Sequence, residues 1–385
     1  MSTDYRTSME GYAEIVREIE VSRKYGVDHR TDRGRWNAAV QRLHPARIEL
    51  RVSDIIQETE RDRTLRLTAA GGYLPPFQAG QYINLLLAVD GVHTSRPYSI
   101  SSSPRQRAYY DITVRKIDGG WVSTYLHEQV GIGDILYSSG PAGQFHFNPL
   151  IHRPELILIA GGSGITPFMS MLREAVDAGL TREFHLIYGC RDEAEMIFAQ
   201  ELKYMALRHD NIAFTPVLSE PDAGRPGATG LITREIIEQA AQGMGDPSYF
   251  VCGPEAMNLH VTAILEAMNV PRRRMRREMA GSLGDITRKP GWPPHLSGQQ
   301  QVNIKIAGQD SIKAACGDSL LSSLEKAGKV MPSLCRSGEC SMCRIKLVQG
   351  EVFQPPGALI RESDRKFGYI HSCRAYPLSD VEIVL

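Results

Sequence analysis

Four cysteines set the strongest constraint on what this chain can fold into. Cys335, Cys340 and Cys343 follow the spacing C-x4-C-x2-C, and Cys373 comes far downstream. Three thiolates on one tight loop and one distant thiolate can hold two irons tetrahedrally, so the spacing predicts a [2Fe-2S] cluster. Gly338 allows a positive φ that turns backbone N–H groups toward the sulfurs. A structural zinc site is the alternative, although zinc sites usually present two C-x2-C pairs and this chain has one.

The remaining sequence is too long for a cluster domain alone. Such a domain needs about 100 residues, and the chain has 385. Lys plus Arg and Asp plus Glu both number 44, so the net charge indicates neither a nucleic acid nor an anionic membrane as a partner. The other cysteines, Cys190, Cys252 and Cys316, form no paired framework, which is typical of a reducing compartment. With no signal peptide and no apolar run of about 20 residues, we expect a cytoplasmic protein without membrane insertion.

Residues 1–45 read as a helical extension. Apolar side chains recur at helical spacing in two runs, on either side of Gly26 and with Asp32 as a candidate N-cap of the second. The runs are Tyr12, Ile15, Val16 and Ile19, then Trp36, Ala39, Val40 and Leu43. Two amphipathic helices either pack on the next domain of this chain or dock on a partner.

Short alternating runs separated by Gly and Pro predict an antiparallel β-barrel over residues 46–150. Three motifs follow one another in it: R-x-Y-S at residues 96–99, G-G-x-x-S at 119–123 and P-x-G-x-F at 141–145. The first motif alone reads as an ordinary strand end. The second opens a predicted helix, where small residues let backbone N–H groups approach a phosphate.

Residues 151–280 predict a doubly wound α/β domain, because apolar strands alternate with helical segments. The apolar run 156–160 leads into the glycine-rich turn 161–167 and a helix, which is the arrangement of a nucleotide phosphate site. Pro167 stands where the third glycine of G-x-G-x-x-G would be, so the turn departs from the ordinary Rossmann pattern. The predicted strands are 184–188, 212–218 and 249–252, and the predicted helices are 195–207, 233–241 and 255–268.

Arg191 follows the second predicted strand and could meet a 2′-phosphate. Asp192 and Glu193 come directly after it, and acidic residues accept hydrogen bonds from a free ribose and repel a phosphate, so we expect NADH rather than NADPH. Cys252 at the last strand is either a site residue or a small buried apolar group. The arginine-rich run 272–277 is either a solvated last strand or a patch that steers an acidic partner.

Residues 281–299 are rich in Gly and Pro and predict an interdomain linker. From residue 300 to 385, two strands, a helix with Asp318 as its N-cap, the cysteine loop and a closing strand at 381–384 predict an α+β domain of β-grasp type.

The three motifs of the barrel resemble the flavin domain of the ferredoxin–NADP reductase superfamily. The turn 161–167 and Cys252-Gly253-Pro254 are similar to its pyridine-nucleotide domain, and the cysteine loop resembles that of plant-type ferredoxins. The resemblance implies that Arg96 neutralises flavin phosphates, Tyr98 stacks on the isoalloxazine and Ser99 bonds near the flavin N5. The implied catalytic residues are Ser99, Cys252 and Glu278. The implied cluster ligands are Cys335, Cys340, Cys343 and Cys373. The implied cofactor-binding residues are Arg96, Pro97, Tyr98, Ser99, Gly119, Gly120, Val122, Ser123, Gly161, Gly162, Gly164, Thr166, Pro167, Arg191, Cys252, Gly253 and Pro254. Met279-Ala280, after Glu278, departs from the usual aromatic ending.

The order of the modules resembles flavin reductases with a C-terminal ferredoxin domain. NADH delivers two electrons as hydride, a flavin can accept two and release one, and the cluster carries one. The resemblance implies FAD rather than FMN, because FMN-using reductases of the phthalate dioxygenase type lack the P-x-G-x-F motif. The expected acceptor is a separate oxygenase, hybrid-cluster protein or similar terminal enzyme. The alternative is an electron-transfer subunit fixed in a larger complex through its N-terminal helices.

Overall fold

The computed structural model describes residues 11–25, 38, 40–43, 45–220, 227–279 and 284–385. The chain divides into two units, residues 1–46 and 47–385. In the first, helix α1 (Tyr12–Tyr25) confirms the first predicted helix, and residues 38 and 40–43 are helical. Gly26, Asp32, Trp36 and Ala39 lie outside the described residues. Among the helices that the structure describes, none has the length and apolar character needed to cross a membrane.

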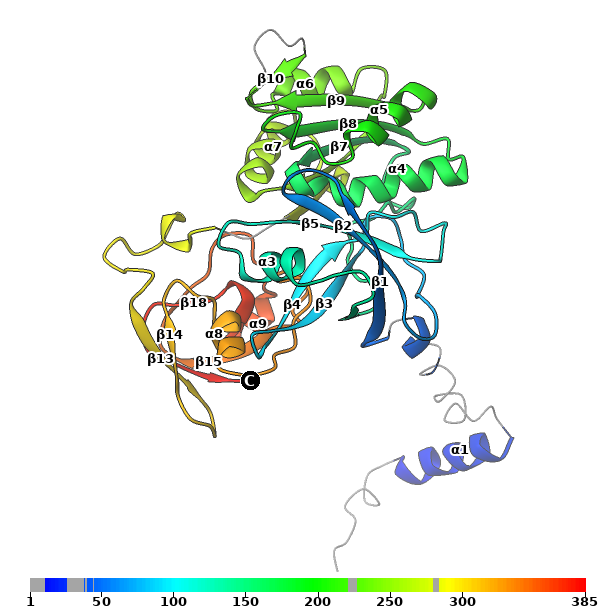
Figure 1. Cartoon of the computed structure of the whole chain (residues 1–385). Helices are drawn as coiled ribbons and strands as arrows, with labels where there is room; N and C mark the ends of the chain where they lie inside the picture. Colours follow the sequence, from blue (N-terminus) through cyan, green and yellow to red (C-terminus); the bar gives the residue numbers. More distant parts are fainter. Residues whose placement is uncertain (1–10, 26–37, 39, 44, 221–226, 280–283) are drawn as a thin grey trace, which may run out of the picture. The chain divides into compact units, whose positions relative to one another are not determined.

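Six antiparallel strands form the first domain of the second unit, in the order β4-β3-β6-β1-β2-β5. Figure 1 shows this sheet in blue and cyan. They are β1 (Ile48–Gln57), β2 (Asp62–Ala69), β3 (Tyr82–Val89), β4 (Val92–Ser99), β5 (Tyr110–Arg115) and β6 (Ile135–Ser138), with helix α3 (Trp121–Glu128) before β6. A bridge between Ile100 and Ile112 joins the two edges of the sheet, so it curls into the predicted barrel. Alternating residues such as Leu50 and Val52 on β1 are fully buried and form its core.

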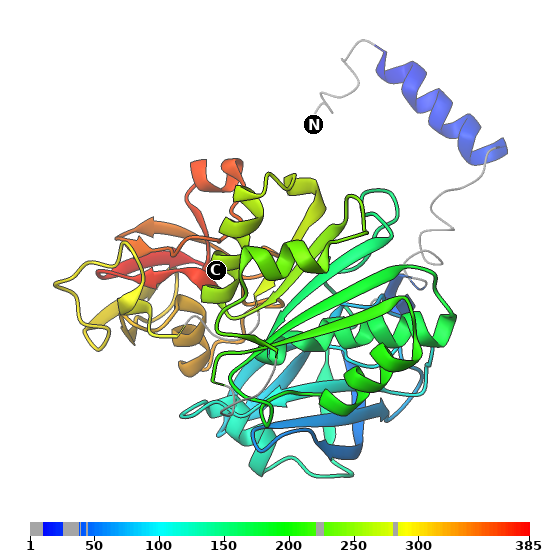
Figure 2. The same ribbon diagram turned by 90° about the horizontal axis from the view of Figure 1, so that it is seen from above.

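The second domain is a parallel sheet in the order β10-β9-β8-β7-β11-β12. Its strands are β7 (Glu155–Gly161), β8 (Glu183–Cys190), β9 (Ile212–Leu218), β10 (Ala228–Thr229), β11 (Ser248–Gly253) and β12 (Met275–Met279), and its helices are η2 (Gly162–Ile165), α4 (Thr166–Ala178), α5 (Ala199–Arg208), α6 (Arg234–Ala240), α7 (Glu255–Ala267) and η3 (Arg272–Arg274). Leu156 and Leu158 of β7 pack in one core and Ile157 and Ile159 in another. Both faces of β7 are therefore buried, as its continuous apolar run predicts, and Figure 2 shows helices on both sides of the green strands.

Two predictions for this domain differ from the structure at element ends. Helix α5 begins at Ala199 and not at Glu195, because the side chain of Asp192 accepts a hydrogen bond from the N–H of Glu195 (2.9 Å) and stabilises a turn there. The arginine-rich run begins in the 3-10 helix η3 and only its later residues belong to strand β12.

The third domain is a five-stranded mixed sheet in the order β14-β13-β19-β15-β17. It contains β13 (Gln301–Ile306), β14 (Ile312–Ala315), β15 (Arg344–Gln349), β17 (Tyr369–His371) and β19 (Val381–Val384), the short pair β16 (Val352–Phe353) and β18 (Tyr376–Pro377), helices α8 (Leu320–Lys326) and α9 (Glu362–Lys366), and the 3-10 helix η5 (Ser372–Arg374). The N-cap of α8 is Ser319, whose hydroxyl accepts from the Ser322 N–H. The prediction of Asp318 is wrong, and its carboxylate pairs with Lys326 at 2.7 Å.

Part of the predicted linker packs on the third domain. Ile286, in the 3-10 helix η4 (Ile286–Arg288), and also Trp292 and Leu296 are buried in its core. The Trp292 ring meets Phe353 edge-on, with centroids 5.5 Å apart. Apolar residues spaced through a Gly- and Pro-rich segment can thus anchor it without regular secondary structure.

Candidate functional site

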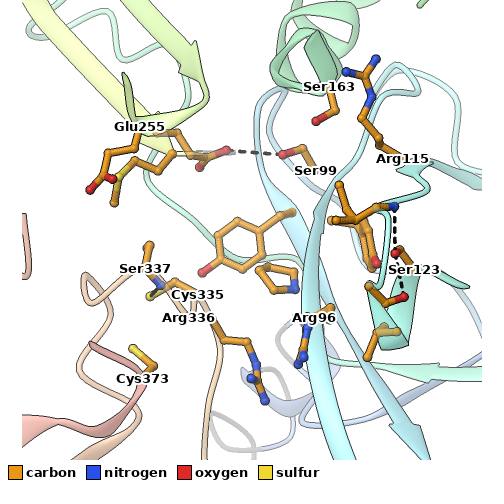
Figure 3. Close-up of a pocket in the computed structure, with 18 of the residues that line it drawn as sticks. Arg96, Ser99, Arg115, Ser123, Ser163, Glu255, Cys335, Arg336, Ser337 and Cys373 are labelled. Carbon is orange, nitrogen blue, oxygen red and sulfur yellow. Dashed lines mark hydrogen bonds between the residues drawn. The ribbon is translucent and has the colours of Figure 1, made fainter. Parts of the chain in front are cut away.

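A cavity of about 470 Å³ lies where the three domains of residues 47–385 meet (Figure 3). Strand β4 and the start of α3 supply one wall, the glycine-rich turn and the end of β12 a second, and the cysteine loop and η5 a third. The lining residues include Tyr82, Arg96, Pro97, Tyr98, Ser99, Arg115, Gly120, Val122, Ser123, Ser163, Thr166, Glu255, Glu278, Cys335, Arg336, Ser337, Cys373, Arg374 and Tyr376.

The first wall combines an arginine, an aromatic ring and a helix start. All four residues of R-x-Y-S, Arg96 to Ser99, line the cavity. Gly120 is the N-cap of α3, and a Cβ there would lie 2.5 Å from the Ser123 hydroxyl, so the position has no room for a side chain. That hydroxyl accepts from the Ile117 N–H (3.1 Å) and donates to the Gly120 carbonyl (3.1 Å), which holds the start of the helix open to an anion.

The charges on this wall fit a phosphate-bearing cofactor. The guanidinium of Arg96 donates to the hydroxyl of Thr94 (2.8 Å) and the carbonyl of Ser95 (2.7 Å). Burial, followed by repulsion from Arg336, lowers the pKa of Arg96 to about 10. The carboxylate of Glu325, which pairs with Arg336, offsets one of the two cations. A bound flavin phosphate would offset the second, so these residues suit the group.

The second wall includes the glycine-rich turn 161–167, which packs directly against strand β11. Ser163 and Thr166 line the cavity, and the Thr166 hydroxyl donates to the Ser163 carbonyl at 2.9 Å. A Cβ on Gly164 would lie 2.2 Å from the backbone oxygen of Cys252, so glycine is required where the turn packs on strand β11.

Cys252 and Glu278 face one another in the register of β11 and β12. The Cys252 side chain is 1% exposed and lies behind the cavity wall, and burial raises the pKa of its thiol. Glu278 lines the cavity, and its carboxylate accepts a hydrogen bond from the Ser99 hydroxyl at 3.4 Å. Burial, followed by the charge of Glu339, raises the pKa of Glu278 to about 8.

Several of the predicted residues do not line the cavity. Gly119, Gly161, Gly162, Gly164, Pro167, Cys252, Gly253 and Pro254 are not among the lining residues. Arg191 also lies elsewhere, where it pairs with Asp192 at 3.6 Å and with Glu195. The acidic residues after the second strand therefore already engage this arginine.

The cysteine loop wraps its backbone around a sulfur. The N–H groups of Ser337, Glu339 and Cys340 donate to Cys335 Sγ at 3.4, 3.4 and 3.3 Å. Gly338 has a φ of 82°, and Arg336 and Ser341 also have positive φ. The predicted positive φ at Gly338 is therefore present, and the N–H groups that it helps to orient stabilise a thiolate.

The four thiols form two pairs. Side-chain interactions join Cys335 with Cys340 and Cys343 with Cys373, and each lowers the pKa of one thiol of the pair, that of Cys335 in the first and that of Cys343 in the second. A cluster with four cysteine ligands places two thiolates on each iron. The pairing therefore fits two irons, with Cys335 and Cys340 on one and Cys343 and Cys373 on the other.

Residues that the sequence did not single out complete the cavity. Arg115 is held by Asp62 through two hydrogen bonds, of 2.8 and 2.9 Å. Glu255, at the start of α7, pairs with Lys289 and lies 3.8 Å from Arg374, which follows Cys373. In the sequence, Arg336 and Arg374 could have been found because each directly follows a cluster cysteine. No sequence pattern pointed to Arg115 or Glu255.

Three protein families match successive parts of the chain. The Oxidoreductase FAD-binding domain matches residues 49–147, the Oxidoreductase NAD-binding domain residues 158–262, and the 2Fe-2S iron-sulfur cluster binding domain residues 304–378. The third match decides between the predicted cluster and the zinc alternative in favour of the cluster.

Relatives match this chain along most of their own length. The glycine betaine monooxygenase reductase subunit of Pseudomonas aeruginosa is 29% identical over 87% of this chain and 94% of its own. Ferredoxin–NADP reductase B of Sorangium cellulosum is 33% identical over 56% of this chain and 90% of its own. The structure of phthalate dioxygenase reductase superposes with a TM-score of 0.67 at 25% identity, covering 88% of this chain and 97% of that one. The chain belongs to the ferredoxin–NADP reductase family and is an NADH-dependent oxidoreductase that uses FAD and a [2Fe-2S] cluster.

Proposed function

We propose that this protein is the reductase component of an oxygenase system, passing electrons from NADH to a separate terminal oxygenase. The observation that carries the proposal is the shared cavity, which the flavin motif, the nucleotide turn and the cluster ligands Cys335 and Cys373 line together. Bound FAD and the cluster supply the conversion of a two-electron hydride donor into single electrons. Two of the relatives above bear the names of oxygenase reductases, which supports an oxygenase over a hybrid-cluster protein as the acceptor.

The residues have separate tasks in this proposal. Arg96 and the open start of α3 hold the flavin phosphates, and Tyr98 covers the ring. Ser99 donates to Glu278, and the raised pKa of about 8 would let this carboxyl hold a proton near neutral pH beside the Ser99 hydroxyl. Ser163 and Thr166 orient NADH, and Cys252 supports the turn from behind. The carboxylates beside Arg191 favour NADH over NADPH.

A comparison of acceptors tests the proposal. The purified protein is mixed with NADH and either a panel of oxygenase components, beginning with that of glycine betaine monooxygenase, or a hybrid-cluster protein. We expect at least one oxygenase to be reduced about ten times faster than the hybrid-cluster protein, an effect of about 1.4 kcal/mol on the barrier. Rapid reduction of the hybrid-cluster protein and of no oxygenase would contradict the proposal.

A second candidate is an electron-transfer subunit docked in a larger complex. The observation that favours it is the N-terminal unit, where apolar residues recur at helical spacing on α1. Deletion of residues 1–45 distinguishes docking of these residues on a partner from their packing on this chain. Loss of a co-purifying partner with intact NADH-dependent dye reduction would support the subunit, and unfolding of the flavin domain would support packing on this chain.

We also infer a cytoplasmic protein, because its cysteines include no paired framework outside the four ligands. We propose domain limits of 46–150 for the flavin domain, 151–280 for the nucleotide domain and 300–385 for the ferredoxin domain. Residues 1–45 are then the N-terminal extension, and residues 281–299 are the linker, whose later part packs on the ferredoxin core.

A further inference from the structure

A buried polar junction joins the flavin domain to the ferredoxin domain beside the cavity. Its centre is the hydroxyl of Thr94 on β4, which donates to the carboxylate of Glu325 on α8 at 3.0 Å. The same hydroxyl accepts from Arg96 at 2.8 Å and from Arg336 at 3.1 Å. Arg336 also pairs with Glu325, and Figure 3 shows Arg96 and Arg336 next to one another. The hydroxyl thus uses its one donor and both acceptor positions.

Burial makes this junction sensitive to the loss of any member. Thr94 is 6% and Glu325 5% exposed, and the Arg336 side chain is 14% exposed. Removal of one partner from a buried ion pair leaves an uncompensated charge and is strongly destabilising. The junction therefore holds one arrangement of the two domains far better than any displaced arrangement.

The junction connects the two redox sites through short chain segments. Arg336 follows the ligand Cys335 directly, and Thr94 lies two residues before Arg96 on the strand that carries the flavin motif. Nearby contacts run the same way: Asn84 donates to the Ser333 carbonyl at 2.9 Å, and the hydroxyls of Ser95 and Ser333 are 2.9 Å apart. These hydrogen bonds join neutral groups, whereas Glu325 contributes a negative charge that pairs with Arg336 and accepts from Thr94.

We propose that Glu325 is a positioning residue, which holds the cysteine loop against the flavin-binding strand and so sets the rate at which electrons pass from the flavin site to the cluster. The inference rests on the proposed function. With the cofactors bound, oxidation of one NADH to NAD⁺ would release one proton and supply two electrons, which would pass one at a time to the cluster and on to the external acceptor. Because electron transfer slows steeply with separation, a looser junction should slow this step more than hydride transfer from NADH.

The experiment uses stopped-flow absorbance without air on the full chain with FAD and cluster. The variants are Glu325→Gln, which removes the charge at constant shape, and Thr94→Val, which removes the hydroxyl from the other domain. We expect both to slow cluster reduction about ten times more than they slow flavin bleaching, a difference of about 1.4 kcal/mol. The double variant should be little slower than either single one, because both break one network.

Asp318→Asn is the matched control. Asp318 lies next to α8 and pairs with Lys326 on the surface, so its loss should leave cluster reduction unchanged. Iron content and the visible spectrum of the cluster establish that each variant keeps its cluster. Solution scattering measures the radius of gyration, which should be larger in Glu325→Gln and Thr94→Val than in the wild type if the domains are held less tightly.

Two results would overturn the inference. One is cluster reduction at the wild-type rate in both variants. The other is loss of iron in Glu325→Gln with a wild-type rate in Thr94→Val, since Glu325 would then act only inside the ferredoxin domain. Failure of the proposed function looks different, because the wild-type cluster would then stay oxidised under NADH or its electrons would reach no oxygenase.

Discussion

The sulfur of Cys335 illustrates how single residues define this protein. Three backbone N–H groups donate to it, and the loop that delivers them depends on the positive φ of Gly338 and its neighbours. A Cβ on Gly338 would lie 2.8 Å from the Arg374 side chain. The loop is thus shaped for a thiolate by backbone conformation as well as by the cysteines.

Serine at either ligand pair should remove the cluster. In Cys335→Ser and Cys343→Ser we expect most of the iron and sulfide to be lost, because a hydroxyl replaces a thiolate on one iron. FAD binding and NADH-dependent dye reduction should persist, since the flavin and nucleotide walls are unchanged. Iron and sulfide analysis with visible spectra measures this. Cys316→Ala, at a buried thiol in the ferredoxin core, is the control and should keep its iron, and a Cys335→Ser protein with full iron would contradict the assignment.

Local spacing singled out Cys335, Cys340 and Cys343, because these thiols lie within nine consecutive positions. The R-x-Y-S residues were singled out only by the resemblance that three ordered motifs carry together. Arg115 and Glu255 could not be found in this way. Arg115 is held by Asp62, 53 residues away, and Glu255 makes tertiary contacts with Lys289 of the linker and Arg374 of the ferredoxin domain. A single sequence carries no signal for such pairs.

At the scale of elements, the strand-turn-helix unit at the nucleotide site has no spare volume. Gly164→Ala would place a methyl group against the backbone of Cys252, and we expect a loss of about 1–3 kcal/mol in stability. The measurements are the thermal unfolding midpoint and the affinity for NADH, and both should fall. Gly71→Ala is the control, because nothing lies within 4 Å of a Cβ there. Equal unfolding midpoints for the two variants would contradict the packing argument.

His152 links the segment before β7 to strand β12 and should make stability depend on pH. Its Nδ1 accepts from the Asn148 N–H (2.9 Å), and Nε of Arg276 lies 3.1 Å from its Nε2. Burial, followed by the charge of Arg276, lowers the pKa of His152 from 6.5 to about 4. The unfolded chain therefore binds more protons between these values, and stability should fall as the pH decreases from 6.5 to 4.

His152→Gln tests this dependence by removing the titrating ring. Unfolding midpoints measured between pH 7 and 4 should fall less in the variant than in the wild type. His295→Gln, at an exposed histidine, should follow the wild-type curve. Parallel curves for His152→Gln and the wild type would show that the ring does not carry the effect.

Periodicity predicted elements well where one pattern covers the whole segment. Strands β9 and β19 have the predicted bounds, 212–218 and 381–384. The errors lie at ends decided by single side chains, such as Asp192 before α5 and Ser319 rather than Asp318 at the start of α8. Polar residues compete there for the same backbone N–H groups, and spacing does not determine which one wins.

For the whole molecule, the order of the three domains follows from the order of their motifs, but their contacts do not. The hydrogen bond between Asn84 and Ser333 joins residues 249 positions apart, and the burial of Trp292 draws part of the predicted linker into a domain core. The cavity that brings the three sites together is therefore a property of tertiary structure.

The most direct test of the central claim is a titration of the purified protein with NADH without air, followed by visible absorbance. Electrons that pass from NADH through the flavin to the cluster should bleach both sets of bands, with about 1.5 NADH per chain for two flavin electrons and one cluster electron. NADPH should act much more slowly. A flavin that bleaches while the cluster stays oxidised, or a protein that binds no flavin, would contradict the account.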